Sequence, residues 1–164
     1  MKDTKISEIM FNQKTKLSTA KAQNDVPSPF PNCLSSDTLI STPDGDIPVT
    51  DLRPRMDVFT LDMDGNKVIK PINLTFETAV RDSHIMCHLI LSDGRKVSAS
   101  EGHFTSDKRL IGDLNTGDIV DGAHVTSIER TRYNSGYTYD LLPDGETGCY
   151  WANGILLRSM YTKP

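Results

Sequence analysis

Short runs of alternating apolar and polar residues, separated by turn residues, fill the chain between Cys33 and Ser159. Such alternation predicts half-buried β-strands, because successive side chains of a strand point to opposite faces of a sheet. Clusters of Asp, Gly, Asn and Pro between the runs predict tight turns. No stretch of this region keeps a helical spacing over a useful length, so we predict an all-β fold. The predicted strands are residues 38–42, 47–49, 57–62, 67–70, 84–91, 96–99, 123–129, 137–142, 150–152 and 155–157.

Two stretches of this region resemble each other. Residues 39–47 read LISTPDGDI, and residues 89–97 read LILSDGRKV. An Asp-Leu pair follows each stretch, at 51–52 and at 113–114, but at unequal distances. The echo indicates either two related β-halves packed as a pseudo-twofold or ordinary turn chemistry that occurs twice.

The segment before Cys33 has a different character. It is polar and rich in Lys and Gln, its apolar spacing fails beyond Leu17, and three prolines crowd its end. We expect a frayed helix or disorder up to about Pro31, with the prolines forming an extended connector. The chain then divides into a flexible N-terminal flank of residues 1–32, a folded domain of residues 33–159 and a C-terminal tail of residues 160–164.

The composition of the chain narrows the classes of function. A net charge of −4 and a pI near 5.5 provide no basic face for phosphates, which argues against nucleic-acid binding. No apolar run approaches the roughly 18 residues of a membrane span. The N-terminus lacks the apolar stretch of a secretory signal, so we expect a cytoplasmic protein that has no membrane partner. Three cysteines at irregular spacing indicate free thiols, and we expect a monomer.

Two groups of residues suggest a metal site, but neither is a complete set of ligands. Asp62 begins a loop that resembles an EF-hand, but Asn73 occupies the position of its bidentate Glu. His84 and His88 share one face of a predicted strand, whereas Cys87 points to the other face. No Cys-x-x-Cys motif accompanies them. We therefore expect no metal and no other cofactor.

Cys33 stands at the first residue of the folded domain, straight after the proline-rich connector. A thiol in this position can attack the peptide bond that precedes it. Ser100 and His103 follow the predicted strand 96–99 and can both turn toward one point. There the hydroxyl can bond a carbonyl, and the imidazole can give a proton to an amide nitrogen. A turn hydroxyl and a solvated histidine would give the same pattern, so this signal is weak on its own.

Three motifs occur in order along the folded domain. The first is CLSSDTLI from Cys33, the second is DGRKV followed by SEGH ending at His103, and the third is YDL around Asp140 followed by WANGILL. Together they resemble the Hint family, which inteins, bacterial intein-like domains and the autoprocessing half of hedgehog proteins share. The resemblance spans residues 33–159, and it implies a compact horseshoe of short strands with pseudo-twofold halves.

The resemblance implies an N-to-S acyl shift at the Asn32–Cys33 bond. The Cys33 thiol would attack the carbonyl of Asn32 and replace the amide by a thioester. Asp140 would lie near the thiol and assist it. His103 would polarise the scissile amide and protonate its departing nitrogen. Ser100 would hold the scissile carbonyl or orient His103.

The C-terminal motif departs from that of splicing inteins. After Asn153 and Gly154 the last strand ends in Arg158-Ser159 in place of His-Asn, and serine has no side-chain amide that could cyclise. Met160 cannot accept an acyl group, because its thioether carries no ionisable hydrogen. We therefore expect the N-terminal flank to be cleaved, or transferred to an external thiol, an amine or water, without full splicing.

Two other interpretations stay open. The chain could be a degenerate Hint fold that has lost its chemistry and serves as a binding or assembly module. It could also be a Cys-His hydrolase that acts on other proteins, an alternative that is weaker because the chain supplies a substrate bond immediately before its own thiol. Cys149 either fills space or acts as an alternative acyl acceptor, and we expect Trp151 in the core.

Overall fold

The computed structural model describes residues 33–162 and the backbone of residues 21–24. Two short 3-10 turns, η1 (Val49–Asp51) and η2 (Ile111–Asp113), occur in this part of the chain. All its other regular elements are strands, which confirms the predicted all-β fold. The strands are β1 (Lys21–Asn24), β2 (Leu39–Thr42), β3 (Gly45–Pro48), β4 (Asp57–Leu61), β5 (Lys67–Ala79), β6 (Ile85–Leu91), β7 (Lys96–Ser100), β8 (Phe104–Thr105), β9 (Ile119–Val120), β10 (Ala123–Arg132), β11 (Tyr137–Pro143), β12 (Cys149–Ala152) and β13 (Ile155–Arg158).

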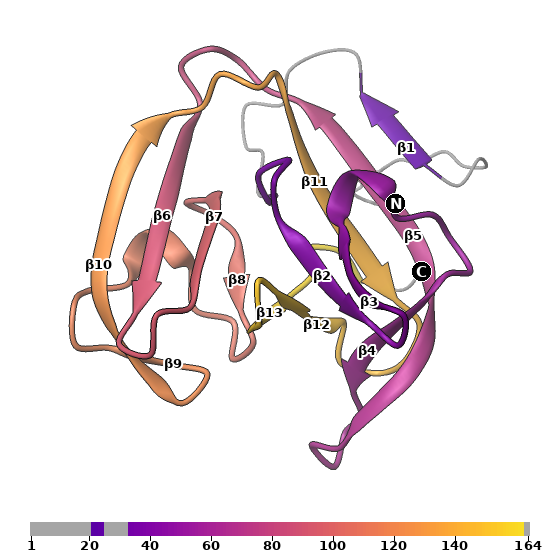
Figure 1. Cartoon of the computed structure of the whole chain (residues 1–164). Helices are drawn as coiled ribbons and strands as arrows, with labels where there is room; N and C mark the ends of the chain where they lie inside the picture. The colour runs from indigo at the N-terminus through magenta and orange to yellow at the C-terminus, as the bar shows by residue number, and fades with distance from the viewer. Residues whose placement is uncertain (1–20, 25–32, 163–164) are drawn as a thin grey trace.

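The described strands form three sheets, whose arrangement Figure 1 shows. One sheet has the order β1-β5-β11, with β4 also paired to β5, and the second has the order β7-β6-β10-β9. The third sheet, β3-β2-β12-β13-β8, lies between the other two in Figure 1. Strands β6 and β10 form one arm of a horseshoe, and β5 and β11 form the other. One core joins the sheets, and its fully buried side chains include Leu34, Leu89, Leu141 and Leu157.

Each predicted strand is present, but several bounds differ. Strand β5 runs on to Ala79, well past the predicted end at residue 70, because Pro71 interrupts the alternation without ending the strand. Strand β10 likewise continues to Arg132. Strands β8 and β9 were not predicted, since two residues carry no alternation that a pattern could detect.

Residues 33–35 join the two arms of the horseshoe. Leu34 exchanges two backbone hydrogen bonds with Tyr139 of β11, at 2.7 and 2.9 Å. On the other side, Ser100 of β7 donates its N–H to the Cys33 carbonyl at 2.9 Å. Leu34 is fully buried between them. Residues 33–35 are therefore fixed at the junction of the two arms.

The two halves of the domain repeat one set of backbone contacts. In each half, one residue of a turn donates its N–H to the carbonyl of a strand residue, and the next turn residue accepts the N–H of that same strand residue. The four distances are 2.8 to 2.9 Å. The Asp-Leu pairs end η1 and η2, and Leu52 and Leu114 have nearly the same backbone angles, φ −71°, ψ 146° and φ −73°, ψ 147°. This repeat confirms the predicted pseudo-twofold. The equivalent residues are Arg55, Met56 and Ile72 in the first half and Gly117, Asp118 and Val125 in the second.

The hairpin equivalent to β2–β3 is not the one that the sequence echo suggests. The echo matched residues 39–47 to residues 89–97, which form the β6–β7 hairpin. In the structure, η2 is preceded instead by β8 and a single bridge at Leu110. Thr42 and Thr105 are equivalent residues of the two hairpins. Both are buried, and each Oγ1 accepts an N–H of its own turn at 3.0 to 3.1 Å. The unequal spacing of the Asp-Leu pairs follows from this mismatch.

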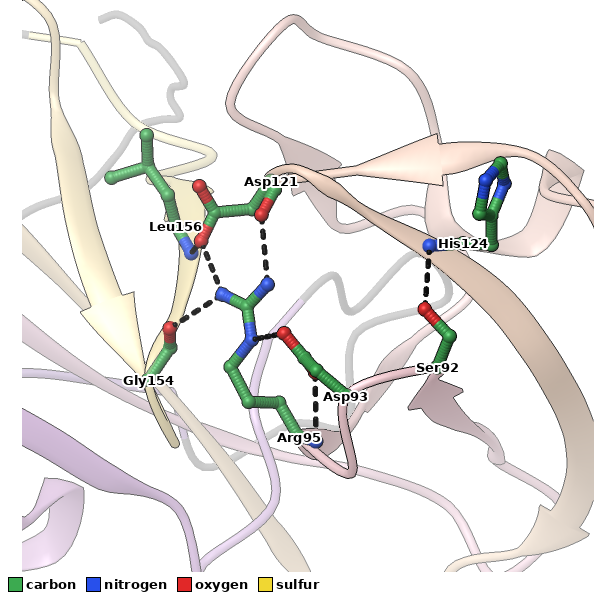
Figure 2. Close-up of polar contacts among 7 residues, drawn as sticks. All are labelled: Ser92, Asp93, Arg95, Asp121, His124, Gly154 and Leu156. Atoms are coloured by element: carbon green, nitrogen blue, oxygen red, sulfur yellow. Dashed lines mark hydrogen bonds and ion pairs between the residues drawn. The ribbon is translucent and has the colours of Figure 1, made fainter.

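The Arg95 side chain contacts residues of three turns (Figure 2). Its guanidinium contacts Asp93 at 2.8 Å, Asp121 at 2.6 Å and the Gly154 carbonyl at 2.9 Å. Asp121 also accepts the Leu156 N–H at 3.0 Å. These partners come from the β6–β7, β9–β10 and β12–β13 connections, so one guanidinium links all three hairpins.

Strand β1 lies in the N-terminal flank, for which we expected a frayed helix or disorder. Its four residues pair in parallel with residues 75–78 of β5, so that expectation is wrong for residues 21–24. The rest of the flank and the last two residues of the chain lie outside the described residues. The described part contains no helix that is long and apolar enough to cross a membrane.

Gly112 of η2 packs directly against Glu101. A Cβ at residue 112 would lie 2.8 Å from the Glu101 Cβ and 3.0 Å from the Glu101 carbonyl oxygen. The Gly112 N–H donates to the same carbonyl at 2.7 Å, which holds the segments at this separation. Gly112→Ala should therefore lower the free energy of unfolding by roughly 1–3 kcal/mol, as overpacking does. Urea denaturation measures this change.

Asp113→Ala is the matched control, because Asp113 lies in the same turn with an exposed side chain. It should change the free energy of unfolding by less than about 0.5 kcal/mol. Equal stability of Gly112→Ala and the wild type would contradict the close packing of η2 against the loop.

Candidate functional site

The Ser100 hydroxyl holds the main chain of Cys33 at two atoms. It accepts the Cys33 N–H at 3.1 Å and donates to the Cys33 carbonyl at 3.0 Å. Both residues are buried, with exposed fractions of 0% for Ser100 and 1% for Cys33. The Cys33 nitrogen belongs to the Asn32–Cys33 peptide bond. The hydroxyl therefore contacts one of the two atoms of the predicted scissile bond.

His103 lies in the loop that follows β7. Its N–H donates to the Ser100 carbonyl at 3.1 Å, and its own carbonyl accepts the Ile111 N–H of η2 at 2.9 Å. These two bonds close a tight turn between the serine and the histidine. The His103 side chain is fully buried, which excludes the alternative of a solvated histidine for this motif.

Tyr150 of β12 connects His103 to Asp140. Its hydroxyl donates to Asp140 Oδ1 at 2.7 Å and lies 3.1 Å from His103 Nε2. Because a phenol has only one hydrogen to donate, it must accept from His103, so Nε2 carries a hydrogen. Burial and the neighbouring Asp140 raise the pKa of Tyr150 well above its ordinary value, which keeps the phenol protonated.

The Asp140 carboxylate of β11 accepts four hydrogen bonds. Oδ1 accepts from the Tyr150 hydroxyl at 2.7 Å and from the N–H of the next residue at 2.8 Å. Oδ2 accepts from the Ser159 hydroxyl at 3.2 Å and from the Met160 N–H at 3.0 Å. A carboxylate offers about four lone-pair sites, so its acceptor capacity is fully used. Burial raises the pKa of Asp140, and the charge of His103 and the donated hydrogen bonds oppose that rise.

Tyr161, in the C-terminal tail, lies beside Cys33. Its ring stacks on Phe76 of β5, with centroids 3.6 Å apart and an interplanar angle of 10°. Burial and the nearby Cys33 and Asp140 raise the pKa of the Tyr161 phenol well above its ordinary value. The same two groups raise the pKa of Tyr150, so the Cys33 thiol and the Asp140 carboxylate share one neighbourhood.

The structure brings the predicted catalytic residues into one buried region. Ser159, from the C-terminal motif, joins them through Asp140. The Ser100 hydroxyl donates to the carbonyl of Cys33, whereas we expected it to hold the scissile carbonyl or to orient His103. The scissile carbonyl belongs to Asn32, which lies outside the described residues. The buried members of the predicted set are Cys33, Ser100, His103 and Asp140.

The other residues of the C-terminal motif build the sheet. Asn153 at φ 49° and Gly154 at φ 79° form the predicted two-residue hairpin turn. The Asn153 side chain accepts the Leu39 N–H at 2.8 Å, which attaches this turn to β2. Arg158 pairs with Cys149 in the ladder between β12 and β13.

Sequence reasoning missed Tyr150 and misplaced its neighbour. Trp151 is half-buried rather than in the core, and the Lys67 ammonium lies 4.9 Å from the centre of its ring. Because side chains alternate along β12, Tyr150 points inward instead. The sequence did offer one signal, a tyrosine in a predicted strand. The hydroxyl of a buried tyrosine needs a hydrogen-bond partner, so it could have indicated a polar contact there. Cys149 is buried, and burial raises the pKa of its thiol.

The residues considered for metals have other partners. The Asp62 carboxylate accepts the N–H groups of Asp64 and Asn66 in its own turn, at 2.9 and 2.8 Å. His84 and His88 contact serine hydroxyls of β7. Across the described residues, no cluster of three or more potential metal ligands occurs.

No protein-family profile matches the sequence, and no curated protein matches it. Solved structures do match. The DnaB intein from Synechocystis sp. PCC 6803 has a TM-score of 0.69 at 17% identity, over 79% of this chain and 99% of that chain. The bacterial intein-like domain from Clostridium thermocellum has a TM-score of 0.65 at 16% identity, over 78% of this chain and 98% of that chain. The gp41-1 intein has a TM-score of 0.62 at 20% identity, over 77% of this chain and 98% of that chain. Likeness at these identities concerns the fold, and the chain has the Hint fold that its three motifs predicted.

Proposed function

We propose that this chain cleaves itself between Asn32 and Cys33 through an N-to-S acyl shift. The observation that carries the proposal is the hold of the Ser100 hydroxyl on both the N–H and the carbonyl of Cys33. It fixes the attacking residue and the departing nitrogen together, and such orientation is what an intramolecular reaction needs. The likeness in fold to inteins and to a bacterial intein-like domain supports autoprocessing in general.

In the first step of the proposed reaction, a bond forms between the Cys33 sulfur and the Asn32 carbonyl carbon. The thiol passes its proton to Asp140, whose buried site raises its pKa and so makes it a stronger base than an exposed carboxylate. Because Asp140 already accepts four hydrogen bonds, it must give up one to take this proton. The bond from the Ser159 hydroxyl, at 3.2 Å, is the longest of the four and the first to yield.

In the second half of the step, the carbon–nitrogen bond breaks and His103 supplies a proton to the departing nitrogen of Cys33. His103 Nε2 is bound to Tyr150, so Nδ1 of the imidazolium is the atom that gives the proton. One proton leaves the thiol for Asp140 and one arrives at the nitrogen from His103, which balances the step. Tyr150 connects the two groups and keeps them in a fixed relation.

The thioester is then consumed by an external thiol, an amine or water, which frees the N-terminal flank. Ser159 stands where splicing inteins carry Asn and has no amide that could form a ring. Met160 offers no nucleophile to take over the acyl group. Residues 160–164 therefore stay attached in the proposed reaction.

Treatment with dithiothreitol or hydroxylamine at neutral pH should remove the mass of residues 1–32 from the purified protein. Both reagents attack the thioester, and the remaining fragment should begin at Cys33 and keep residues 160–164. Intact mass spectrometry over time measures the reaction. Cys33→Ala should stay at full length under every condition, because it has no thiol at the junction.

Cys149→Ala is the matched control, because it removes another buried thiol but not the nucleophile. Cys149→Ala should cleave at the wild-type rate. If it formed the thioester but no longer released the N-terminal flank, Cys149 would be identified as the acyl acceptor. An unchanged wild-type mass in every reagent would contradict self-cleavage and favour a binding module. Cleavage of an added peptide would favour a hydrolase that acts on other proteins.

Tyr150→Phe should lower the free energy of unfolding by roughly 1–3 kcal/mol at neutral pH, because buried groups on Asp140 and His103 each lose a partner. The change also removes a donor to the charged carboxylate, so the pKa of Asp140 should rise further. When the pKa of an Asp is higher in the folded state than in the unfolded state, where it is about 3.9, the folded state holds the proton more tightly. The free energy of unfolding then falls as the pH rises from about 3.9 through the folded-state pKa. The deficit should therefore be smaller near pH 4 than near pH 7 in urea denaturation.

Tyr133→Phe provides the control for this pH dependence. The Tyr133 hydroxyl accepts the Ser36 N–H at 3.0 Å and donates to the Tyr137 carbonyl at 2.7 Å, and both partners are uncharged. Its loss should cost the same free energy at both pH values. An equally pH-independent deficit for Tyr150→Phe would mean that its hydroxyl does not stabilise the charged form of Asp140.

A further inference from the structure

The Ser100 hydroxyl has a third close partner. Its single hydrogen goes to the Cys33 carbonyl, and the Cys33 N–H uses one of its two lone pairs. His84 Nε2 lies 2.9 Å from the same oxygen. With the hydrogen on the Cys33 carbonyl, the second lone pair is left to accept, and His84 takes the tautomer that donates its Nε2–H to Ser100.

We infer that His84 is a positioning residue of the self-cleavage reaction, whose Nε2–H keeps the Ser100 hydroxyl directed at Cys33. This inference rests on the proposed function. His84 immediately precedes β6 and belongs to none of the three motifs. Without its donor, the hydroxyl could turn toward the Met86 sulfur, a weak acceptor 3.7 Å away, and release the Cys33 main chain.

The surroundings of His84 keep its ring in this orientation. The Tyr133 ring meets it edge-on, with centroids 6.3 Å apart and an angle of 82°, and the Tyr133 N–H donates to the His84 carbonyl at 2.9 Å. Glu101 is the charged group that acts on the imidazole, and Arg130 pairs with that carboxylate at 2.9 Å. Burial lowers the pKa of His84, so its ring is neutral at physiological pH. The neutral Nε2–H tautomer and the imidazolium both donate, so the hold on Ser100 does not require a charge.

A second histidine, His88 of β6, offers a matched control. His88 Nδ1 lies 2.6 Å from the Ser98 hydroxyl, and His84 and His88 are both half-buried. Ser98 and Ser100 stand two residues apart on β7 and so lie on one face of it. It is the Ser100 hydroxyl that contacts Cys33. Each pair joins an imidazole nitrogen to a serine hydroxyl, although His88 Nε2 also lies 2.6 Å from the Thr131 hydroxyl. The two pairs differ in their connection to Cys33.

Hydrogen exchange at residue 33 tests the positioning without any need for cleavage. Both Ser100 contacts are to main-chain atoms, so they persist in the uncleavable Cys33→Ala protein. In that background His84→Leu should speed exchange of the residue 33 amide by about tenfold, whereas His84→Gln, which keeps an N–H, and His88→Leu should change it by less than about twofold. Exchange at the centre of β6 reports whether each variant stays folded. An unchanged residue 33 amide in folded His84→Leu overturns the inference.

Cleavage rates test the same inference in the reactive protein. His84→Leu should slow thioester formation by about tenfold at pH 6 to 8 alike, and His84→Gln should restore most of the rate. Combining His84→Leu with Ser100→Ala should be no slower than Ser100→Ala alone, because His84 acts through that hydroxyl. Additive losses, or slowing at one end of the pH range only, overturn the positioning role. If the wild type does not cleave, the proposed function fails, and the exchange experiment alone decides the role of His84.

Discussion

The pairing of residues 33–35 with both arms of the horseshoe is the constraint on which the rest of the site depends. Leu34 binds β11 through two backbone hydrogen bonds, and the Cys33 carbonyl binds β7. A free loop would let the junction sample many orientations, whereas reaction within one chain requires the reacting groups to be held in one. Because the two partners belong to different arms, Cys33 keeps its place only while the arms keep theirs. The whole domain therefore fixes the main chain of Cys33.

Each arm brings a different kind of group to the neighbourhood of Cys33. Ser100 and His103, from β7 and the loop after it, lie on the side that holds the Cys33 nitrogen. Asp140 comes from β11, in the other arm, and Tyr150 of the central sheet connects it to His103. A buried charge is tolerated only when it is paired or hydrogen-bonded. The network around Asp140 meets this condition, and Asp140 itself is buried.

Local patterns predicted the parts of this structure that depend on neighbouring residues. Alternation predicted the strands, and Asn153-Gly154 predicted a turn in which both residues have positive φ. Tyr150 and His84 escaped prediction because their partners stand 47 and 16 residues away. The choice of Trp151 as the core residue was wrong by one position, and a shift of one residue reverses the faces of a strand. The echo likewise matched the wrong hairpin, because similar turn residues recur wherever strands reverse.

Residues 159–161 couple the stability of the site to its proposed reactivity. Ser159 and Met160 together supply both hydrogen bonds to Oδ2 of Asp140, and Tyr161 follows directly beside Cys33. These bonds stabilise a carboxylate that burial alone would favour in its neutral form. The same bonds occupy the lone pairs that the proposed base needs for the thiol proton. A serine in place of the cyclising Asn thus has a role in the folded state, as a donor to the carboxylate. In the proposed reaction, the Ser159 hydroxyl releases Oδ2 when the thiol gives up its proton, so the same hydrogen bond stabilises the resting carboxylate and limits its action as a base.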